Sequence, residues 1–284
     1  MKRIEKTVYI TAAAIVISCA LSKEPTEIVI RMGEPARLCD QMYLYVLGTS
    51  IEKRGFSVKY HVPYIENKNF QLLKAFPYLN FKMISSFEAD KYKKFNISHG
   101  ENYDVCLNCR PPAYILKINC HDRLIDYSKY FYFDKKILDA VNLKILEKIR
   151  AQPCAIGVHV RRTDMSISHD YFSALSADYF IKAVQKAKEL FRAPYFFFFS
   201  DDVDWVKKNI LPQLKADTKY EVIDVNDYSK GYMDMFLMSE CKHQIRSQGS
   251  MGEMSYILNK YPLKKLIAPK KCRTDVNVTP DFEI

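Results

Sequence analysis

Several features that would place this chain outside the ordinary globular classes are scarce or missing. The 284 residues include only 8 Gly and 1 Trp, against 20 Tyr and 17 Phe. Hydrophobic residues make up 48% and charged residues 27%, a balance that excludes an intrinsically disordered protein. An N-terminal apolar run, residues 8–21, is shorter than the roughly 20 residues that span a bilayer. The composition therefore predicts an aromatic-rich core with few flexible hinges, in a chain long enough for two modest domains.

The sequence also lacks a Lys/Arg block and an aromatic-basic RNA motif, although its net charge is +10. This charge favours anionic partners such as nucleotides, and we expect no nucleic acid among them. Much of the Lys falls on predicted helices, where a solvated helix face is the simpler interpretation. The spacing of Cys106, Cys109 and Cys120 faintly suggests zinc, but the second pair is incomplete. We therefore expect no metal site, and reduced, buried thiols.

Residues 1–24 form a separate N-terminal segment with three open interpretations. It could be a signal-like or weakly anchoring segment. Residues 16–19 also resemble a lipoprotein cleavage box. The plainer alternative to both is that the segment is a buried element of the first domain, or that translation starts at a later codon. We expect a cytoplasmic protein, with peripheral membrane contact through this segment left open.

Strand-like and helix-like segments alternate along the rest of the chain. Residues 27–32 and 57–62 read as strands on either side of a helix over 36–54, and Asp134 is predicted to cap a helix whose apolar face includes Val141. Strands then read at 154–160, 195–199, 220–225 and 243–246, each followed by a predicted helix. This pattern predicts doubly wound parallel α/β layers, with a domain boundary near residue 150.

The sharpest chemical signal follows the predicted strand at 154–160, where His159, Arg161, Arg162 and Asp164 stand close together. Charged side chains at the carboxyl end of a strand emerge where α/β proteins bind ligands. Arginine forms bidentate hydrogen bonds to phosphate and can neutralise a pyrophosphate leaving group. Because successive strand residues face opposite ways, one Arg can meet phosphate while the other, or Asp164, braces the loop. A purely structural Arg–Asp cluster is the alternative.

Two further turns follow predicted strands in the same half. Asp201 and Asp202 could bind a ribose or a base edge, although helix capping alone explains one of them. The turn containing Ser247, Gln248 and Ser250 leads into a helix, so its backbone N–H groups and hydroxyls could hold phosphate. All three turns lie at strand-to-helix junctions, which predicts a nucleotide cradle.

The segment 157–164 also resembles the V-H-I-R-R-G-D motif of the bacterial α-1,2-fucosyltransferases. Similarity continues through residues 178–183, 198–207 and 234–243, and covers most of 131–260. The resemblance implies a GT-B-like fold of two doubly wound α/β domains facing a cleft. The acceptor side would lie in 25–150, and the donor nucleotide would bind in 151–284. It also implies GDP-fucose as donor, inversion at the anomeric carbon and no metal or other cofactor.

The same resemblance assigns roles by position. Arg161 and Arg162 would bind or organise the diphosphate, with His159 and Asp164 shaping that loop, and Asp201, Asp202 and Asp234 supporting the nucleotide side or the fold. The catalytic base is left open among Asp40, Glu34 and Asp164, and Gln41 belongs with Glu34 on the acceptor side. The acceptor would be a hydroxyl, such as the 2-OH of a galactoside, on a glycan or lipid-linked oligosaccharide.

Two segments depart from the family pattern. Residues 36–42 correspond to the Gly-Gly-Leu-Gly-Asn-Gln-Met turn of the family. They lack its glycines, although Gln41 and Met42 remain. The N-S-T/S-F-S-W-W segment is replaced by residues 248–254, and its Ser247-Gln248 pair is similar to that of the α-1,6-fucosyltransferases. Two alternatives therefore stay open: transfer from another GDP-sugar, or a non-catalytic protein that binds a nucleotide or glycan.

Overall fold

The computed structural model describes residues 27–32, 37–63, 70–95, 113–115, 126–163, 174–270 and 279–284. The chain divides into two compact units. The N-terminal unit comprises residues 1–36, 40–66 and 80–120, and the C-terminal unit comprises 37–39, 67–79 and 121–284. The apolar segment 1–24 lies outside the described residues.

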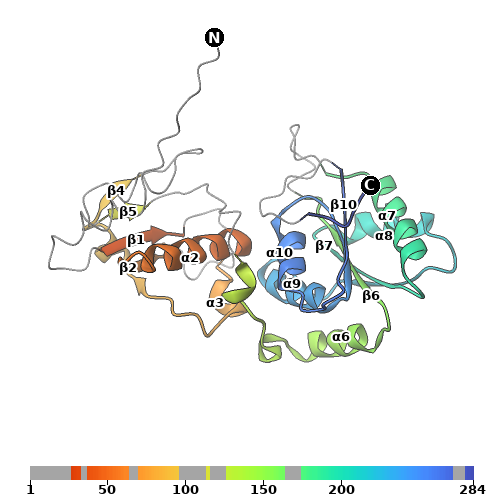
Figure 1. Ribbon diagram of the computed structural model, residues 1–284, viewed down its shortest axis with the longest axis horizontal. Coiled ribbons are helices and arrows are strands. Elements are labelled where there is room, and N and C mark those ends of the chain that lie inside the picture. The colour runs from red at the N-terminus through yellow and green to blue at the C-terminus, as the bar shows by residue number, and fades with distance from the viewer. Residues whose placement is uncertain are drawn as a thin grey trace, which may run out of the picture. The chain divides into compact units, whose positions relative to one another are not determined.

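The N-terminal unit is built on a parallel sheet of five strands in the order β3-β2-β1-β5-β4. Its elements are β1 (Glu27–Arg31), α2 (Leu38–Glu52), β2 (Ser57–His61), β3 (Met83–Ile84), α4 (Ser86–Ala89), β4 (Lys93–Phe95) and β5 (Ala113–Ile115) (Figure 1). The central strand β1 is apolar and buried, as expected for a parallel strand. Gly48 of α2 permits a close approach, because a Cβ there would lie 2.0 Å from the Tyr60 hydroxyl oxygen.

The C-terminal unit contains a second sheet of six parallel strands in the order β11-β10-β9-β6-β7-β8. Its strands are β6 (Ala155–Val160), β7 (Tyr195–Ser200), β8 (Lys219–Ile223), β9 (His243–Arg246), β10 (Leu266–Ala268) and β11 (Phe282–Glu283). Its α-helices are α3 (Leu72–Ala75), α6 (Ala140–Ala151), α7 (Ala177–Leu190), α8 (Val203–Asn209), α9 (Gly231–Glu240) and α10 (Ser250–Leu258). The described part of this unit also contains the short 3₁₀ helices η1 (Tyr127–Lys129), η2 (Lys135–Ile137), η3 (Leu211–Gln213) and η4 (Tyr228–Lys230).

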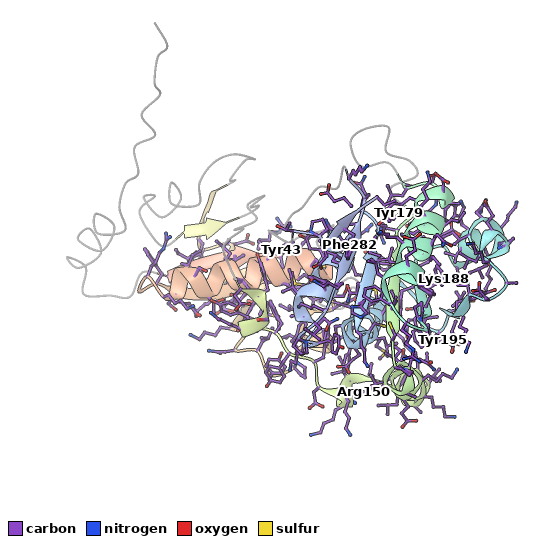
Figure 2. All side chains as sticks on the ribbon, turned by 45° about the vertical axis from the view of Figure 1, so that its right-hand side comes forward. Tyr43, Arg150, Tyr179, Lys188, Tyr195 and Phe282 are labelled. Atoms are coloured by element: carbon purple, nitrogen blue, oxygen red, sulfur yellow. The ribbon has the colours of Figure 1, made fainter. Side chains whose placement is uncertain are left out.

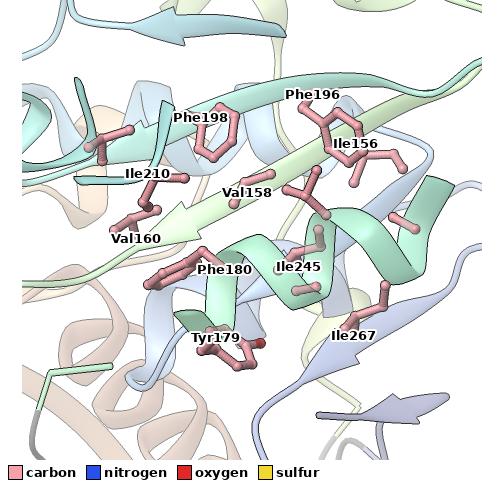
Figure 3. Close-up of a cluster of buried hydrophobic side chains, with 14 of the residues drawn as sticks. Ile156, Val158, Val160, Tyr179, Phe180, Phe196, Phe198, Ile210, Ile245 and Ile267 are labelled. Carbon is pink, nitrogen blue, oxygen red and sulfur yellow. The ribbon is translucent and has the colours of Figure 1, made fainter. Parts of the chain in front are cut away.

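Helices cover both faces of this second sheet. On one face, Phe180 of α7 packs against Val158, Val160 and Phe198 (Figure 3). On the other face, α6 and α9 contribute Leu146 and Phe236 to a separate cluster. Tyr179 on α7 and Arg150 on α6 mark these two sides of the unit (Figure 2). The predicted doubly wound parallel architecture is therefore present in the C-terminal unit.

Strand β7 is almost continuously aromatic, and the two clusters explain why. Phe196 and Phe198 enter the cluster beneath α7, while Phe197 and Phe199 enter the cluster beneath α6 and α9. Because side chains alternate along a strand, a strand covered on both faces must be apolar at every position.

Residues 121–150, which the sequence assigned to the first domain, belong to the C-terminal unit. Helix α6 is apolar on one side, and its Leu146 is buried in the C-terminal core. The predicted cap of this helix is also wrong. Asp139, whose Oδ1 accepts the Asn142 N–H at 3.0 Å, caps α6, whereas Asp134 caps the preceding η2. Val141, expected on the apolar face, is exposed.

The thiols that the structure describes are those of Cys39, Cys154 and Cys241, and all of them are buried. The Cys106, Cys109 and Cys120 positions lie outside the described residues. In the described part of the chain, no helix combines the length and the apolar character that crossing a membrane requires.

Candidate functional site

The strand order of the second sheet reverses direction between β6 and β9. From β6 the chain proceeds to β7 and β8 on one side, and β9, β10 and β11 then extend the sheet on the other. Ligands of open α/β sheets bind at the carboxyl ends of the strands beside such a switch point. Residues 161–163 follow β6 and residues 247–249 follow β9, so two of the three predicted turns lie at this position.

Alternation along β6 separates its side chains into two faces. Val158 and Val160 belong to the core beneath α7. His159 faces the other way, where its Nδ1 lies 3.1 Å from the Ser247 Oγ. Because the β6 register pairs His159 with Arg246 on β9, three polar residues meet at the switch point.

Asp201, which follows β7, organises the loop after β6. Its carboxylate accepts the backbone N–H groups of Arg162 at 2.8 Å and Thr163 at 3.2 Å, and the Thr163 hydroxyl at 2.6 Å. The Arg161 Nη1 lies 2.8 Å from Asp201 Oδ2, and both side chains are largely buried. Asp201 therefore holds the loop and orients one guanidinium, and the ribose or base contact expected from the sequence stays a prediction.

The two adjacent arginines have different surroundings. The Arg162 guanidinium carbon lies 3.9 Å from the centroid of the Trp205 ring, and its Nη1 donates to the Leu175 carbonyl at 3.1 Å. Arg162 is thus stacked on the first turn of α8, which suits a bracing role. Arg161, by contrast, is held by Asp201 beside the Ser247 turn.

Ser247 ties the two switch-point strands together. Its N–H donates to the His159 carbonyl at 3.0 Å, and its Oγ accepts the Arg161 N–H at 3.0 Å. The Oγ also lies 3.1 Å from His159 Nδ1 and 3.3 Å from the Gln248 carbonyl. Since 3.3 Å is long for an O–H···O bond, we assign the Ser247 hydroxyl as the donor to His159 Nδ1. The ring proton of His159 is then on Nε2.

His159 is neutral at physiological pH. The residue is 5% exposed, and burial, together with the nearby Arg246 charge, lowers the pKa of His159 to about 4, despite the opposing charge of Asp201. A neutral imidazole fits the hydrogen bond to Ser247 and a role in shaping the loop.

Two glycines shape the turn between β9 and α10. Gly249 has φ of +102°, a conformation that favours glycine, and it stands at the N-cap of α10 without a side-chain cap. A Cβ on Gly252 would lie 2.7 Å from His159 Nδ1 and 3.1 Å from the Arg246 Cβ. Helix α10 therefore packs directly on the carboxyl ends of β6 and β9.

The other predicted site residues have varied positions. Asp202 is the N-cap of α8, its Oδ1 accepting the Trp205 N–H at 3.0 Å. Gln248 is buried in the turn, and Ser250 begins α10. Asp40 and Gln41 lie at the start of α2 in the N-terminal unit. Glu34 and Asp164 lie outside the described residues, so their predicted roles stay predictions.

Asp234 belongs to a hydrogen-bonded network at the start of α9. Its Oδ1 accepts from Asn226 Nδ2 at 2.7 Å, and Asn226 also bonds Asn142 of α6. Part of the Asp234 residue is accessible, but the loss of water around its carboxyl group raises the pKa of Asp234 to about 7. The hydrogen bond from Asn226 lowers this pKa and only partly offsets the effect of burial. Within the described residues, this network of Asp234, Asn226 and Asn142 therefore links α9, the loop after β8 and α6.

Sequence reasoning did not find Arg246 and Glu253, which form a buried ion pair beneath α10, with Nη1 3.1 Å from Oε2. The sequence placed Arg246 at the end of a predicted strand, and it placed Glu253 in the segment that differs from the family motif. No sequence signal linked them, because six residues and a sharp turn separate them.

Known proteins from Escherichia coli are similar to this chain in sequence. The chain is 26% identical over 239 residues to the O-antigen biosynthesis glycosyltransferase WbnK of Escherichia coli, covering 79% of this chain and 74% of that protein. It is 32% identical over 120 residues to an alpha-1,2-colitosyltransferase of Escherichia coli, covering 40% of each.

The fold has relatives among solved structures. A mutant of Arabidopsis thaliana FUT1 in complex with GDP matches with a TM-score of 0.55 at 10% identity, covering 94% of this chain and 75% of that chain. The α/β fold of this protein is therefore GT-B-like, as the sequence predicted. The family model described as glycosyl transferase family 11 matches residues 13–272. The chain thus belongs to glycosyltransferase family 11 and transfers a glycosyl group from a nucleotide-sugar donor to a glycan.

Proposed function

We propose that this glycosyltransferase transfers L-fucose from GDP-fucose, with inversion, to a galactoside hydroxyl, the 2-OH being the first candidate. The observation that carries the proposal is the arrangement at the switch point. There Arg161, oriented by Asp201, stands beside the Ser247 turn at the carboxyl ends of β6 and β9. A nucleotide diphosphate is the anion that such a combination of guanidinium, turn and helix N-terminus suits.

In this proposal the acceptor oxygen attacks the anomeric carbon as the bond from that carbon to the diphosphate oxygen breaks. Negative charge develops on the departing diphosphate, and Arg161 and the turn containing Ser247 stabilise it. Arg162 acts indirectly, since its stacking on Trp205 holds the loop from which Arg161 projects. Because the charge is neutralised by protein groups, the proposal requires no metal.

The acceptor hydroxyl loses its proton late in this displacement. Asp40, at the start of α2, is the described candidate for the base, while Glu34 and Asp164 remain candidates on sequence grounds. Substituting each by its amide separates them, because only the true base should lower kcat strongly without raising the KM for the donor.

The direct test measures GDP release and product formation with GDP-fucose and a set of β-galactosides. Stimulation of release by a galactoside, with an α-1,2-linked product of inverted configuration, is the expected result. Arg161→Ala should lower kcat/KM by about 100-fold or more. Arg150→Ala is the matched control, because it removes an exposed arginine of the same unit. Near wild-type turnover in Arg161→Ala would overturn the phosphate role.

A second candidate function is transfer of a different deoxysugar. It is favoured by the 32% identity over 120 residues to a protein named alpha-1,2-colitosyltransferase. Competition of nucleotide-activated colitose against GDP-fucose for the same acceptor decides between them, since the true donor should show the higher kcat/KM.

A further inference from the structure

Strand β9 presents an apolar face to one side and a polar face to the other. Ile245 packs into the core beneath α7. Gln244 and Arg246, which alternate with it, instead contact α10, and both are buried. The interface between β9 and α10 thus contains buried polar contacts where an apolar contact would ordinarily stabilise a helix on a sheet.

Two contacts define this polar seam. Ser255 Oγ donates to Gln244 Oε1 at 3.1 Å, and Arg246 Nη1 lies 3.1 Å from Glu253 Oε2. The two contacts run in opposite directions along the two elements. Gln244 precedes Arg246 on β9, whereas the partner of Gln244, Ser255, follows the partner of Arg246, Glu253, on α10. A shift of α10 by a single residue would therefore break both contacts at once.

The Arg246–Glu253 pair is poorly explained as a source of stability. Its side chains are 1% and 0% exposed, so both charges lose their hydration. The Arg246 Nε, Nη1 and Nη2 have no hydrogen-bond partner among the described residues, so the contact with Glu253 is an ion pair and not also a hydrogen bond. Apolar residues of similar volume are often as stabilising as a buried pair, whereas a buried polar contact can select one register.

The remaining contacts hold α10 at both ends. Near its start, Gly252 brings the helix against His159 and Arg246 without room for a side chain. At its end, Lys264 Nζ donates to the Tyr256 and Asn259 carbonyls, each at 2.7 Å. Because α10 begins at Ser250, fixing its register also fixes the preceding turn that contains Ser247.

We propose that Arg246 and Glu253 are positioning residues that fix α10 on β9 and thereby set the geometry of the donor-facing turn, residues 247–250. The proposal rests on the proposed function in one respect, namely that this turn binds the donor diphosphate. Neither residue is assigned contact with the donor.

The test compares Glu253→Gln and the apolar pair Arg246→Met/Glu253→Leu with the wild type. The matched control is Arg150→Met/Glu240→Leu, which removes an exposed ion pair with Nη2 and Oε2 2.7 Å apart. Three quantities are measured: the Tm, the backbone hydrogen exchange of residues 247–254, and the Kd for GDP. Hydrogen exchange requires no donor, so the positioning role is tested even if the proposed donor is wrong.

The apolar pair should retain the wild-type Tm to within a few degrees. Its residues 247–254 should nevertheless exchange faster, and its Kd for GDP should rise about 10- to 100-fold. Glu253→Gln should change the same two readouts, and the control should change neither. Wild-type exchange at 247–254 in both folded variants would overturn the proposal, as would global unfolding of the apolar pair. Faster exchange in a protein whose wild type does not bind GDP would instead contradict the proposed function alone.

Discussion

Replacing Gly252 by Ala tests how tightly α10 rests on the strand ends. In an unhindered helix this change should stabilise the protein by about 1 kcal/mol, because alanine has the higher helix propensity. Here the new Cβ would lie 2.7 Å from His159 Nδ1. The imidazole cannot move freely, since it is buried and lies 3.1 Å from Ser247 Oγ.

Overpacking of this kind costs about 1 to 3 kcal/mol, and displacing His159 also costs a buried hydrogen bond worth about 1 kcal/mol. Subtracting the propensity gain leaves a net loss of about 1 to 3 kcal/mol. For a unit of this size the corresponding fall in Tm is about 2 to 12 °C. Affinity for GDP should fall as well, because the Ser247 turn moves with His159.

Gly231→Ala is the matched control, since a Cβ at this helical glycine would meet no heavy atom closer than 3.6 Å. Differential scanning calorimetry of both variants, with GDP titrations, measures the two effects. A Gly252→Ala protein as stable as Gly231→Ala, with unchanged GDP affinity, would refute the close packing of α10 on His159.

Three further results are expected. Arg162→Met should lower stability by about 1 to 2 kcal/mol and alter the fluorescence of Trp205, which is the only Trp, because it removes the guanidinium stacked on that ring. Asp234→Asn should reduce the decrease in the free energy of unfolding that the wild type shows as pH rises from about 4 to 7. There the folded state retains a proton on Asp234, whose pKa is raised to about 7, while the unfolded state has released it, so wild-type stability falls as pH rises. The lowered pKa values of His159 and His243, both about 4, act in the opposite direction, and urea titrations of both proteins across this range isolate the Asp234 effect by difference. Treatment with EDTA should leave turnover unchanged, and its loss with recovery on adding Mg²⁺ would contradict neutralisation by Arg161.

Local sequence patterns were sufficient for much of the C-terminal unit. Short apolar runs bounded by polar residues predicted β6 and β7, and the charged residues after them marked the strand ends. The cap of α6 was missed because Asp134 and Asp139 are both aspartates that precede apolar residues. Only the packing of Leu146 and its neighbours shows which turn continues as a helix.

The candidate site was predictable where it depends on one strand and its loop. His159, Arg161 and Ser247 were found because they stand at strand ends, but the division of labour between the two arginines depends on Trp205 and Asp201. The burial of charged residues beneath α10 was not predictable, because in a sequence such residues are expected to face solvent.

The aromatic strand β7 also affects how the protein can be produced. In the folded unit β6 and β8 pair with both of its edges, and helices cover both faces. During synthesis, however, residues 196–199 emerge before residues 219–223 exist to pair with the second edge. A chain ending before β8 would expose a long apolar strand edge, which favours intermolecular β pairing and aggregation. A shortened form of the C-terminal unit should therefore extend past β8, and slow translation between these two strands should increase the insoluble fraction.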